Sequence, residues 1–303
     1  MMQYCFHKGQ IKPSTEATLS LASHCIQYGT SVFGGMRGYF KNGQATLFRM
    51  KDHHQRLINA AKIFGWDYHI SFDNFSKIIH ELVQKNNPDT DFYIRPFIYS
   101  DSEVLTPCFH KLEYDMGIYM IPLGDYLDTS KGLRLMISSY QKFPDSSIST
   151  KAKASGAYLH SSAARSEANN RGYDEALVMD VNWKIVEGSA ENLIMVYGGE
   201  VIIPPLASDA LEGISIRSAI QILKDKNIPI RYEYIDRSMA YTCDELLLTG
   251  TAANILYGES VDDRIISKEM GPICKMLRQE FEQIINNNHP RSSDWITQIK
   301  INK

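Results

Sequence analysis

The sequence has no apolar run that approaches the roughly 18 residues of a membrane-spanning helix, and its first residues, MMQYCFHKGQ, lack the apolar stretch of a signal peptide. It also lacks a strong excess of either charge. The formal net charge is -3 at pH 7, so a general attraction for nucleic acid or an anionic membrane is not expected. The five cysteines are scattered without a C-x-x-C pair, which favours free thiols in a reducing compartment. We therefore expect a cytoplasmic protein without nucleic-acid or membrane partners.

Several common catalytic motifs are also missing. The sequence has no G-x-G-x-x-G dinucleotide motif, no G-x-x-x-x-G-K-[ST] phosphate loop, no H-E-x-x-H zinc motif and no G-x-S-x-G nucleophile elbow. The densest histidine pair, His53-His54, is a poor metal site because adjacent helical residues do not share a face. We therefore expect no metal centre.

Apolar residues recur at helical and strand spacing along the whole chain. Gly172 suits a helix end, Gly198-Gly199 is typical of a hairpin turn, and Pro96 predicts an edge position or a break in its strand. The spacing predicts helices over residues 53–66, 72–86, 155–172, 214–227 and 270–285. Runs of β-branched and aromatic residues predict strands over 45–49, 91–100, 133–140, 175–181, 184–197 and 244–256.

The order of these elements indicates a fold class. At 303 residues the chain is long enough for two domains. Helices and strands alternate irregularly and include a hairpin, so we expect an α+β arrangement with mixed sheets rather than a doubly wound parallel sheet. The pattern loosens at residues 123–132. We predict a small N-terminal domain over 1–122, an interdomain loop over 123–132 and a larger C-terminal domain over 133–303.

Three segments set polar side chains among small residues, which let the backbone approach a ligand closely. They read K-A-K-A-S-G-A-Y at 151–158, E-G-S-A-E-N at 187–192 and G-T-A-A at 250–253. Each segment alone is typical of a tight turn. Three further motifs occur in the N-terminal part: Y-G-T-S-V-F at 28–33, H-H-Q-R-L at 53–57 and Y-I-R-P at 93–96.

In this order and spacing, the six motifs resemble those of the branched-chain aminotransferases, which are fold-type IV enzymes dependent on pyridoxal 5'-phosphate (PLP). The resemblance extends over nearly the whole chain and implies the two-domain fold of that family, with the cofactor bound by the larger domain. It also implies a homodimer or a higher homo-oligomer.

The resemblance assigns the chemistry to Lys153, which begins the K-A-x-G-x-Y motif. This lysine would carry the cofactor as a Schiff base and move a proton during the reaction. Lys151 is interpreted as a solvated loop charge. Glu187 would hold a proton on the pyridine nitrogen of the cofactor, and Tyr158 would bind its ring hydroxyl oxygen. For Glu191 we expect either a role in the surrounding hydrogen-bond network or an exposed strand carboxylate.

The phosphate of the cofactor needs cations and N–H donors. By resemblance, Arg56 supplies the planar N–H donors of its guanidinium to the phosphate. The backbone of Ile214 and Ser215 supplies N–H groups at a helix start, although Ser215 would also suit a plain N-cap. Thr251 adds a hydroxyl group. The family usually has Thr-Arg where this chain has Ser215-Ile216.

Substrate recognition in the family uses an apolar, aromatic pocket that also accepts glutamate. Tyr93 and Arg95 match the pair that accommodates the glutamate side chain, whereas Gly34 stands where the family commonly has glutamate. The turn that begins at Gly250 offers donors to the substrate α-carboxylate. The implied substrate-binding residues are Tyr28, Phe33, Gly35, Tyr93, Arg95, Tyr126, Thr251 and Ala252.

The resemblance therefore implies transfer of the amino group of leucine, isoleucine or valine to 2-oxoglutarate, with amino acids and 2-oxo acids as the partners. Other fold-type IV enzymes are the alternatives: a D-amino-acid aminotransferase, an (R)-amine transaminase or an aminodeoxychorismate-lyase-like enzyme. A PLP-binding protein without turnover is a further alternative, against which the joint presence of Lys153, Glu187, Arg56 and Tyr158 argues.

Overall fold

The structure is a computed structural model that describes residues 1–124 and 131–301. Tyr126 and most of the predicted interdomain loop lie outside the described residues. The chain forms two compact units. The first unit contains Met1–Gly124, Ala152–Gly156 and the chain from Ile284 onward, and the second contains Lys131–Lys151 and Ala157–Gln283. The domain boundaries at 122 and 133 stay a prediction. In the structure, Ala152–Gly156 and the C-terminal segment belong to the same compact unit as the N-terminal residues.

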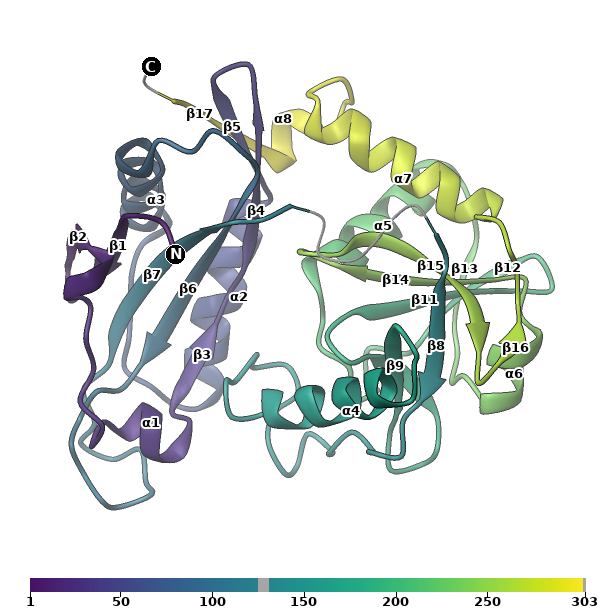
Figure 1. The fold of residues 1–303 in the computed structure, drawn as a ribbon, viewed down its shortest axis with the longest axis horizontal. Coiled ribbons are helices and arrows are strands. Elements are labelled where there is room, and N and C mark those ends of the chain that lie inside the picture. The colour runs from purple at the N-terminus through teal and green to yellow at the C-terminus, as the bar shows by residue number, and fades with distance from the viewer. Residues whose placement is uncertain (125–130, 302–303) are drawn as a thin grey trace. The chain divides into compact units, whose positions relative to one another are not determined.

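Among the described residues, the first unit holds an eight-stranded sheet with the order β17-β5-β4-β6-β7-β1-β2, in which β3 pairs with β6. The helices α2 and α3 contact strands of this sheet and each other (Figure 1). The elements of the unit are β1 (Tyr4–His7), β2 (Gln10–Pro13), η1 (Ser14–Glu16), α1 (His24–Tyr28), β3 (Ser31–Phe33), β4 (Met36–Lys41), β5 (Gln44–Phe48), α2 (Met50–Ile63), α3 (Phe72–Asn86), β6 (Phe92–Tyr99), β7 (Asp115–Pro122), α8 (Ser292–Trp295) and β17 (Ile296–Lys300).

The helix α3 shows how the local sequence sets an element. Ser71 is its N-cap, and the Ser71 side chain accepts a hydrogen bond of 3.2 Å from Asn74 N. The apolar face that the spacing predicts is buried at Phe75, Ile79 and Leu82. The predicted helix over 72–86 is therefore confirmed, as is the strand predicted over 45–49, which is β5.

Pro96 does not lie at an edge and does not break its strand. It lies inside β6, which pairs with β7 on one side and with β3 and β4 on the other. The gap between β3 and β4 falls opposite Pro96, so its missing N–H leaves no ladder bond unmade there. Pro96 O still accepts a hydrogen bond of 2.8 Å from Gly34 N. A Cβ atom at Gly34 would lie 3.0 Å from Pro96 Cγ, so a side chain there would crowd the proline ring.

Among the described residues, the second unit holds a nine-stranded sheet with the order β10-β9-β8-β15-β14-β11-β12-β13, in which β16 pairs with β15. Most pairs are antiparallel, but β8 pairs in parallel with β9 and β15, and β12 with β13, which confirms the mixed-sheet α+β prediction. The elements are β8 (Leu133–Ile137), α4 (Tyr158–Asn170), β9 (Glu175–Met179), β10 (Ile185–Gly188), β11 (Asn192–Tyr197), β12 (Glu200–Ile203), α5 (Ile214–Asp225), β13 (Ile230–Tyr232), α6 (Arg237–Thr242), β14 (Glu245–Gly250), β15 (Asn254–Val261), β16 (Arg264–Ile265) and most of α7 (Pro272–Ile285).

The strand β9 is buried on both faces, which explains its nearly continuous apolar run. Leu177 and Met179 belong to the main core of the unit, whereas Ala176 and Val178 pack with residues of α4 in a second cluster. The single strand predicted over 184–197 is in fact two strands, β10 and β11, joined by a turn at 189–191. The predicted hairpin at Gly198-Gly199 is confirmed: it joins β11 to β12.

The five cysteines are all free. Within residues 1–124 and 131–301, no helix is both long enough and apolar enough to cross a bilayer.

Candidate functional site

Lys153 lies in a short extended segment that runs beside β3 in the first unit. Phe33 N donates a hydrogen bond of 3.1 Å to Lys153 O, and Ser155 N donates one of 2.8 Å to Ser31 O. The approach of this segment requires small residues, since a Cβ atom at Gly29 would lie 3.1 Å from the Cα atom of Gly156. The backbone of β3 therefore fixes the position of Lys153.

Lys153 and Arg95 both lie over the ring of Phe33, and Arg95 also lies over the ring of Tyr93. Lys153 Nζ lies 5.0 Å from the centre of that ring, and the Arg95 guanidinium carbon lies 4.5 Å from it. The same Arg95 carbon lies 5.0 Å from the centre of the Tyr93 ring. Gly35 leaves room for Tyr93, because an added Cβ atom would overlap the Tyr93 hydroxyl. The result is a lysine amine beside an aromatic wall that also carries a guanidinium.

His53 is buried among cations on α2. Its exposed fraction is 2%, and its pKa lies well below the ordinary value because burial disfavours the imidazolium and because Arg56, Lys153 and Arg49 add positive charge. Arg49 is neutralised in part by Asp52, whose Oδ2 lies 2.8 Å from Arg49 Nε. Arg56 and Lys153 therefore both lower the pKa of the His53 imidazole. Their combined positive charge suits an anion such as phosphate.

Tyr28 contacts Leu105 and His24. Its hydroxyl donates a hydrogen bond of 2.8 Å to Leu105 O, its ring lies 4.7 Å from that of His24, and its exposed fraction is 41%. Tyr28 is therefore not a core residue. Phe33, by contrast, is buried.

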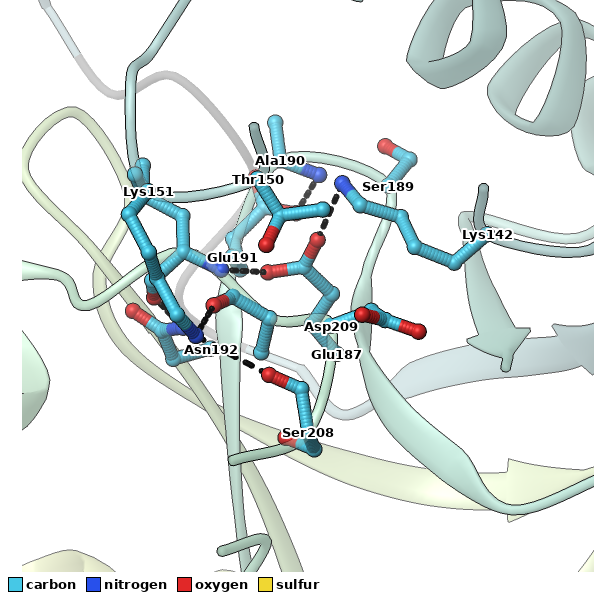
Figure 2. A network of polar contacts seen from close by, with 12 residues as sticks. Lys142, Thr150, Lys151, Glu187, Ser189, Ala190, Glu191, Asn192, Ser208 and Asp209 are labelled. Atoms are coloured by element: carbon cyan, nitrogen blue, oxygen red, sulfur yellow. Dashed lines mark hydrogen bonds and ion pairs between the residues drawn. The ribbon is translucent and has the colours of Figure 1, made fainter. Parts of the chain in front are cut away.

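Glu187 is the central carboxylate of the second unit. It lies on β10 with an exposed fraction of 5%. Its Oε1 atom lies 2.6 Å from Lys142 Nζ, and its Oε2 atom accepts a hydrogen bond of 3.1 Å from Leu211 N (Figure 2). Lys142 could not be predicted from the sequence, because a lysine in a polar loop has no distinguishing pattern. The ion pair lets a carboxylate be buried without an uncompensated charge.

Lys151 is not a solvated loop charge. Its ammonium group donates hydrogen bonds to the carbonyl oxygens of Leu206, Ser208 and Ala210 at 2.9, 2.9 and 2.6 Å (Figure 2). Burial lowers its pKa, although nearby carboxylates, Glu187 first among them, oppose the effect. Lys151 therefore stabilises the loop that places Leu211 N against Glu187. All three hydrogen bonds of its amine go to carbonyl oxygens of that loop.

Glu191 is not an exposed strand carboxylate either. It lies in the turn between β10 and β11, and its exposed fraction is 4%. Burial and the neighbouring Glu175 raise the pKa of Glu191 to about 8, although Arg165 opposes this. Arg165 forms an ion pair with Glu175, and Glu175 Oε1 accepts a hydrogen bond of 3.3 Å from Ser189 N. The network therefore supports the turn that follows Glu187.

The start of α5 presents backbone N–H groups, as the sequence predicts. Its N-cap is Gly213, so the interpretation of Ser215 as a plain N-cap is wrong. Ile214 and Ser215 form the first turn, where N–H groups have no partner within the helix. Gly213 is required here, because an added Cβ atom would overlap the amide oxygen of Asn192. Ile216, which stands in place of the usual arginine, is buried.

Thr251 and Ala252 lie in the tight turn between β14 and β15, which the Gly250–Asn254 pair closes. A Cβ atom at Gly250 would lie 3.4 Å from Glu191 Cγ. The structure thus brings two of the motif segments, 187–192 and 250–253, together in the second unit. Tyr158 is the first residue of α4 and is partly buried.

These residues fit the requirements of PLP. The first unit offers an amine beside a group of cations, and the second offers a buried carboxylate, a helix N-terminus and two hydroxyl-bearing residues. An aromatic cofactor with an anionic phosphate and a basic ring nitrogen needs these groups. The donor chemistry therefore agrees with the sequence-based assignment, although each residue's role stays a prediction.

Comparison with known proteins identifies the relatives of this chain. The family model described as amino-transferase class IV matches residues 31–261. The probable branched-chain-amino-acid aminotransferase of Aquifex aeolicus is 35% identical, over 98% of this chain and 97% of that protein. The branched-chain-amino-acid aminotransferase of Escherichia coli K12 is 34% identical over the same shares.

Solved structures agree with this. The branched-chain aminotransferase of Thermoproteus uzoniensis, solved with norvaline, superposes with a TM-score of 0.94 at 33% identity, covering 98% of this chain and 99% of that one. Together with the two sheets, this similarity confirms the predicted fold-type IV architecture.

Proposed function

The chain belongs to the class IV amino-transferase family, and from this premise we propose that it transfers the amino group of L-leucine, L-isoleucine or L-valine to 2-oxoglutarate with PLP as cofactor. The observation that carries the proposal is the group formed by Lys153, Phe33 and Arg95. A branched-chain enzyme must accept an apolar side chain in one half-reaction and a carboxylate in the other. An aromatic wall with a partly buried guanidinium stacked on it offers both surfaces.

The cofactor, when bound, draws electrons from the bond next to the substrate amino group. In the first unit, Lys153 would hold it through the side-chain amine, and Arg56 would bind the phosphate. In the second unit, the N–H groups of Ile214 and Ser215 and the hydroxyls of Ser215 and Thr251 would donate to phosphate oxygens.

Two residues of the second unit would tune the ring of the cofactor. Glu187 would accept a hydrogen bond from the protonated pyridine nitrogen and so favour that protonated form. Lys142 and Leu211 N hold the Glu187 carboxylate in place, which limits its reorientation. Tyr158 would donate a hydrogen bond to the ring oxygen.

Lys153 would then act as the acid–base group. With the cofactor bound, the Lys153 amine would move a proton between the substrate α-carbon and the cofactor within each half-reaction, in opposite directions in the two. The apolar side of Phe33 would exclude water near that amine. The segment paired with β3 would keep the amine in position.

Substrate selection would use the same group. Phe33 and Tyr93 would contact a branched aliphatic side chain, and Arg95 would pair with the side-chain carboxylate of glutamate. Gly35 would let the Tyr93 hydroxyl keep its position beside the substrate. Thr251 and Ala252 would donate to the α-carboxylate, and Tyr28 and Tyr126 are assigned to substrate binding by resemblance alone.

The homodimer and the cytoplasmic location are part of the proposal. The comparisons do not favour the D-amino-acid, (R)-amine or lyase-like alternatives, since the reported relatives carry the branched-chain name. Turnover would distinguish the enzyme from a protein that only binds PLP.

The proposal has a direct test. The protein saturated with PLP should show an absorbance band in the visible or near ultraviolet that disappears in Lys153→Ala and persists in Lys151→Ala, the matched lysine two residues away. L-leucine, L-isoleucine and L-valine should then react with 2-oxoglutarate as acceptor. A wild-type protein that stays colourless with PLP, or that converts D-alanine or a chiral amine but not L-leucine, would contradict it.

A further inference from the structure

Asn192 closes the E-G-S-A-E-N segment and has no role in the reaction proposed above. It is the first residue of β11, where it pairs with Glu187 of β10 on one side and with Thr249 of β14 on the other. Residues that lie directly opposite each other in antiparallel strands point to the same face of the sheet. The Asn192 amide therefore lies on the sheet face that carries the Glu187 carboxylate.

The Asn192 amide holds the backbone that binds Glu187. Asn192 Nδ2 donates a hydrogen bond of 2.6 Å to Leu211 O, and Leu211 N donates the bond of 3.1 Å to Glu187 Oε2. Ala210 O, in the same peptide group as Leu211 N, accepts a bond of 2.6 Å from Lys151 Nζ. Side chains therefore fix the peptide groups on both sides of Leu211, and Asn192 fixes the second of them.

The same amide packs against the N-cap of α5. A Cβ atom at Gly213 would lie 2.1 Å from Asn192 Oδ1 and 3.3 Å from Asn192 Cγ, so the amide occupies the space beside the glycine. Gly213 precedes Ile214 and Ser215, whose N–H groups begin the helix. One side chain thus contacts both ends of the segment 211–213.

The segment 211–213 links two parts of the candidate cofactor site in the second unit. Its first residue supplies an N–H group to Glu187, and its last residue caps the helix that would bind the phosphate. Protein N–H···O hydrogen bonds are about 2.7–3.2 Å long, so at 3.1 Å the bond to Glu187 tolerates little lengthening. A shift of the segment would therefore disturb the carboxylate and the helix start together.

The chemistry of an amide suits this place. An amide has donors and an acceptor but no net charge, so Asn192 holds Leu211 O without competing with Lys142 for the Glu187 carboxylate. An aspartate would have the same shape, but it would lack the donor and would place a second negative charge opposite Glu187. A leucine has nearly the same shape and makes no hydrogen bond.

We propose that Asn192 is a positioning residue that sets the Glu187 carboxylate and the start of α5 as one unit, through the segment 211–213. This role rests on the proposed function, which assigns Glu187 to the pyridine nitrogen and the helix start to the phosphate. Asn192 acts through the backbone of 211–213 rather than through contact with the reacting atoms. The two cofactor contacts therefore depend on the same side chain.

Asn192→Leu tests this role by absorbance titration of the full chain with PLP and with pyridoxal, which lacks the phosphate. The affinity for PLP should fall about tenfold, because both cofactor contacts are disturbed. The fall should be only about threefold for pyridoxal, and also about threefold for PLP in a Glu187→Gln background, because one of the two contacts is already absent in each case. For pyridoxal in the Glu187→Gln background, Asn192→Leu should have no effect, because neither contact remains.

Asn169→Leu is the matched control, because Asn169 Nδ2 also donates to a backbone oxygen, that of Tyr173, at 3.1 Å. The control should leave all four affinities unchanged. Equal losses in all four titrations of Asn192→Leu, or no loss in any, would overturn the positioning role. A loss for PLP alone, with none for pyridoxal, would refute the link to Glu187.

Should Asn192→Leu fail to fold, Asn192→Asp removes the same donor, and the same four titrations apply. A wild-type chain that binds neither PLP nor pyridoxal would overturn the proposed function and this role with it. A wild-type chain that binds PLP, together with an Asn192 variant of unchanged affinity, would overturn this role alone.

Discussion

The buried turn carboxylate Glu191 makes the stability of this protein depend on pH. Its pKa of about 8 in the folded chain, against an ordinary 4.5, means that the folded state keeps a proton that the unfolded state releases. The stability from this group is therefore present below about pH 4.5 and is lost as the pH rises toward 8. Glu191→Gln keeps the shape of the protonated side chain and an N–H donor for Glu175 but cannot ionise.

The magnitude follows from the two pKa values. At about 1.4 kcal/mol for each pH unit, the interval from 4.5 to about 8 corresponds to an upper limit of about 5 kcal/mol. Glu175 shares the effect, so we expect an observed change of about 2–4 kcal/mol. The free energy of unfolding of Glu191→Gln, relative to wild type, should rise by this amount between pH 5 and pH 8.5.

Urea unfolding of the apoprotein, followed by tryptophan fluorescence at several pH values, measures this difference. Glu81→Gln is the matched control, because Glu81 is an exposed carboxylate on α3. The control should show no comparable trend relative to wild type. A difference between Glu191→Gln and wild type that stays flat from pH 5 to pH 8.5 would refute the reasoning.

Three further substitutions test the site. Lys142→Met leaves the Glu187 carboxylate buried and unpaired, so the free energy of unfolding in a urea titration should fall by about 3 kcal/mol. Gly35→Ala forces the Tyr93 hydroxyl to move, and kcat/KM for L-leucine should fall about tenfold or more, which corresponds to ~1.4 kcal/mol. Lys151→Met frees the loop that it holds, and PLP titrations by absorbance should show about tenfold weaker binding without loss of the band at saturation.

Each of these substitutions has an outcome that contradicts its premise. Lys184→Met breaks a more exposed pair with Asp236 and should cost less than about 1 kcal/mol, so an equal cost for Lys142→Met would contradict the buried-pair argument. An unchanged kcat/KM in Gly35→Ala would show that Tyr93 adjusts freely. Unchanged PLP affinity in Lys151→Met would separate the loop from the cofactor site.

Much of the local structure could be predicted from the sequence. Apolar spacing located α2, α3 and α5, and the pair Gly198-Gly199 located a hairpin, because these signals depend on neighbouring residues alone. The motif order indicated the family, which the comparisons confirm. The candidate site residues could be chosen in the same way, since small residues around Lys153 and Glu187 form compact sequence patterns.

The sequence by itself thus determined the five longer helices, about half of the described strands, the family and the choice of the candidate residues. Only the tertiary structure decided which charges are buried and which partners they have. Pro96 is tolerated inside β6 because the gap between β3 and β4 faces it. Lys142 pairs with the Glu187 carboxylate and Lys151 donates to carbonyl groups, and all these partners lie more than 40 residues away in the chain. Local patterns do not encode such contacts, because hydrogen bonds and ion pairs depend on where distant segments meet after the core has formed.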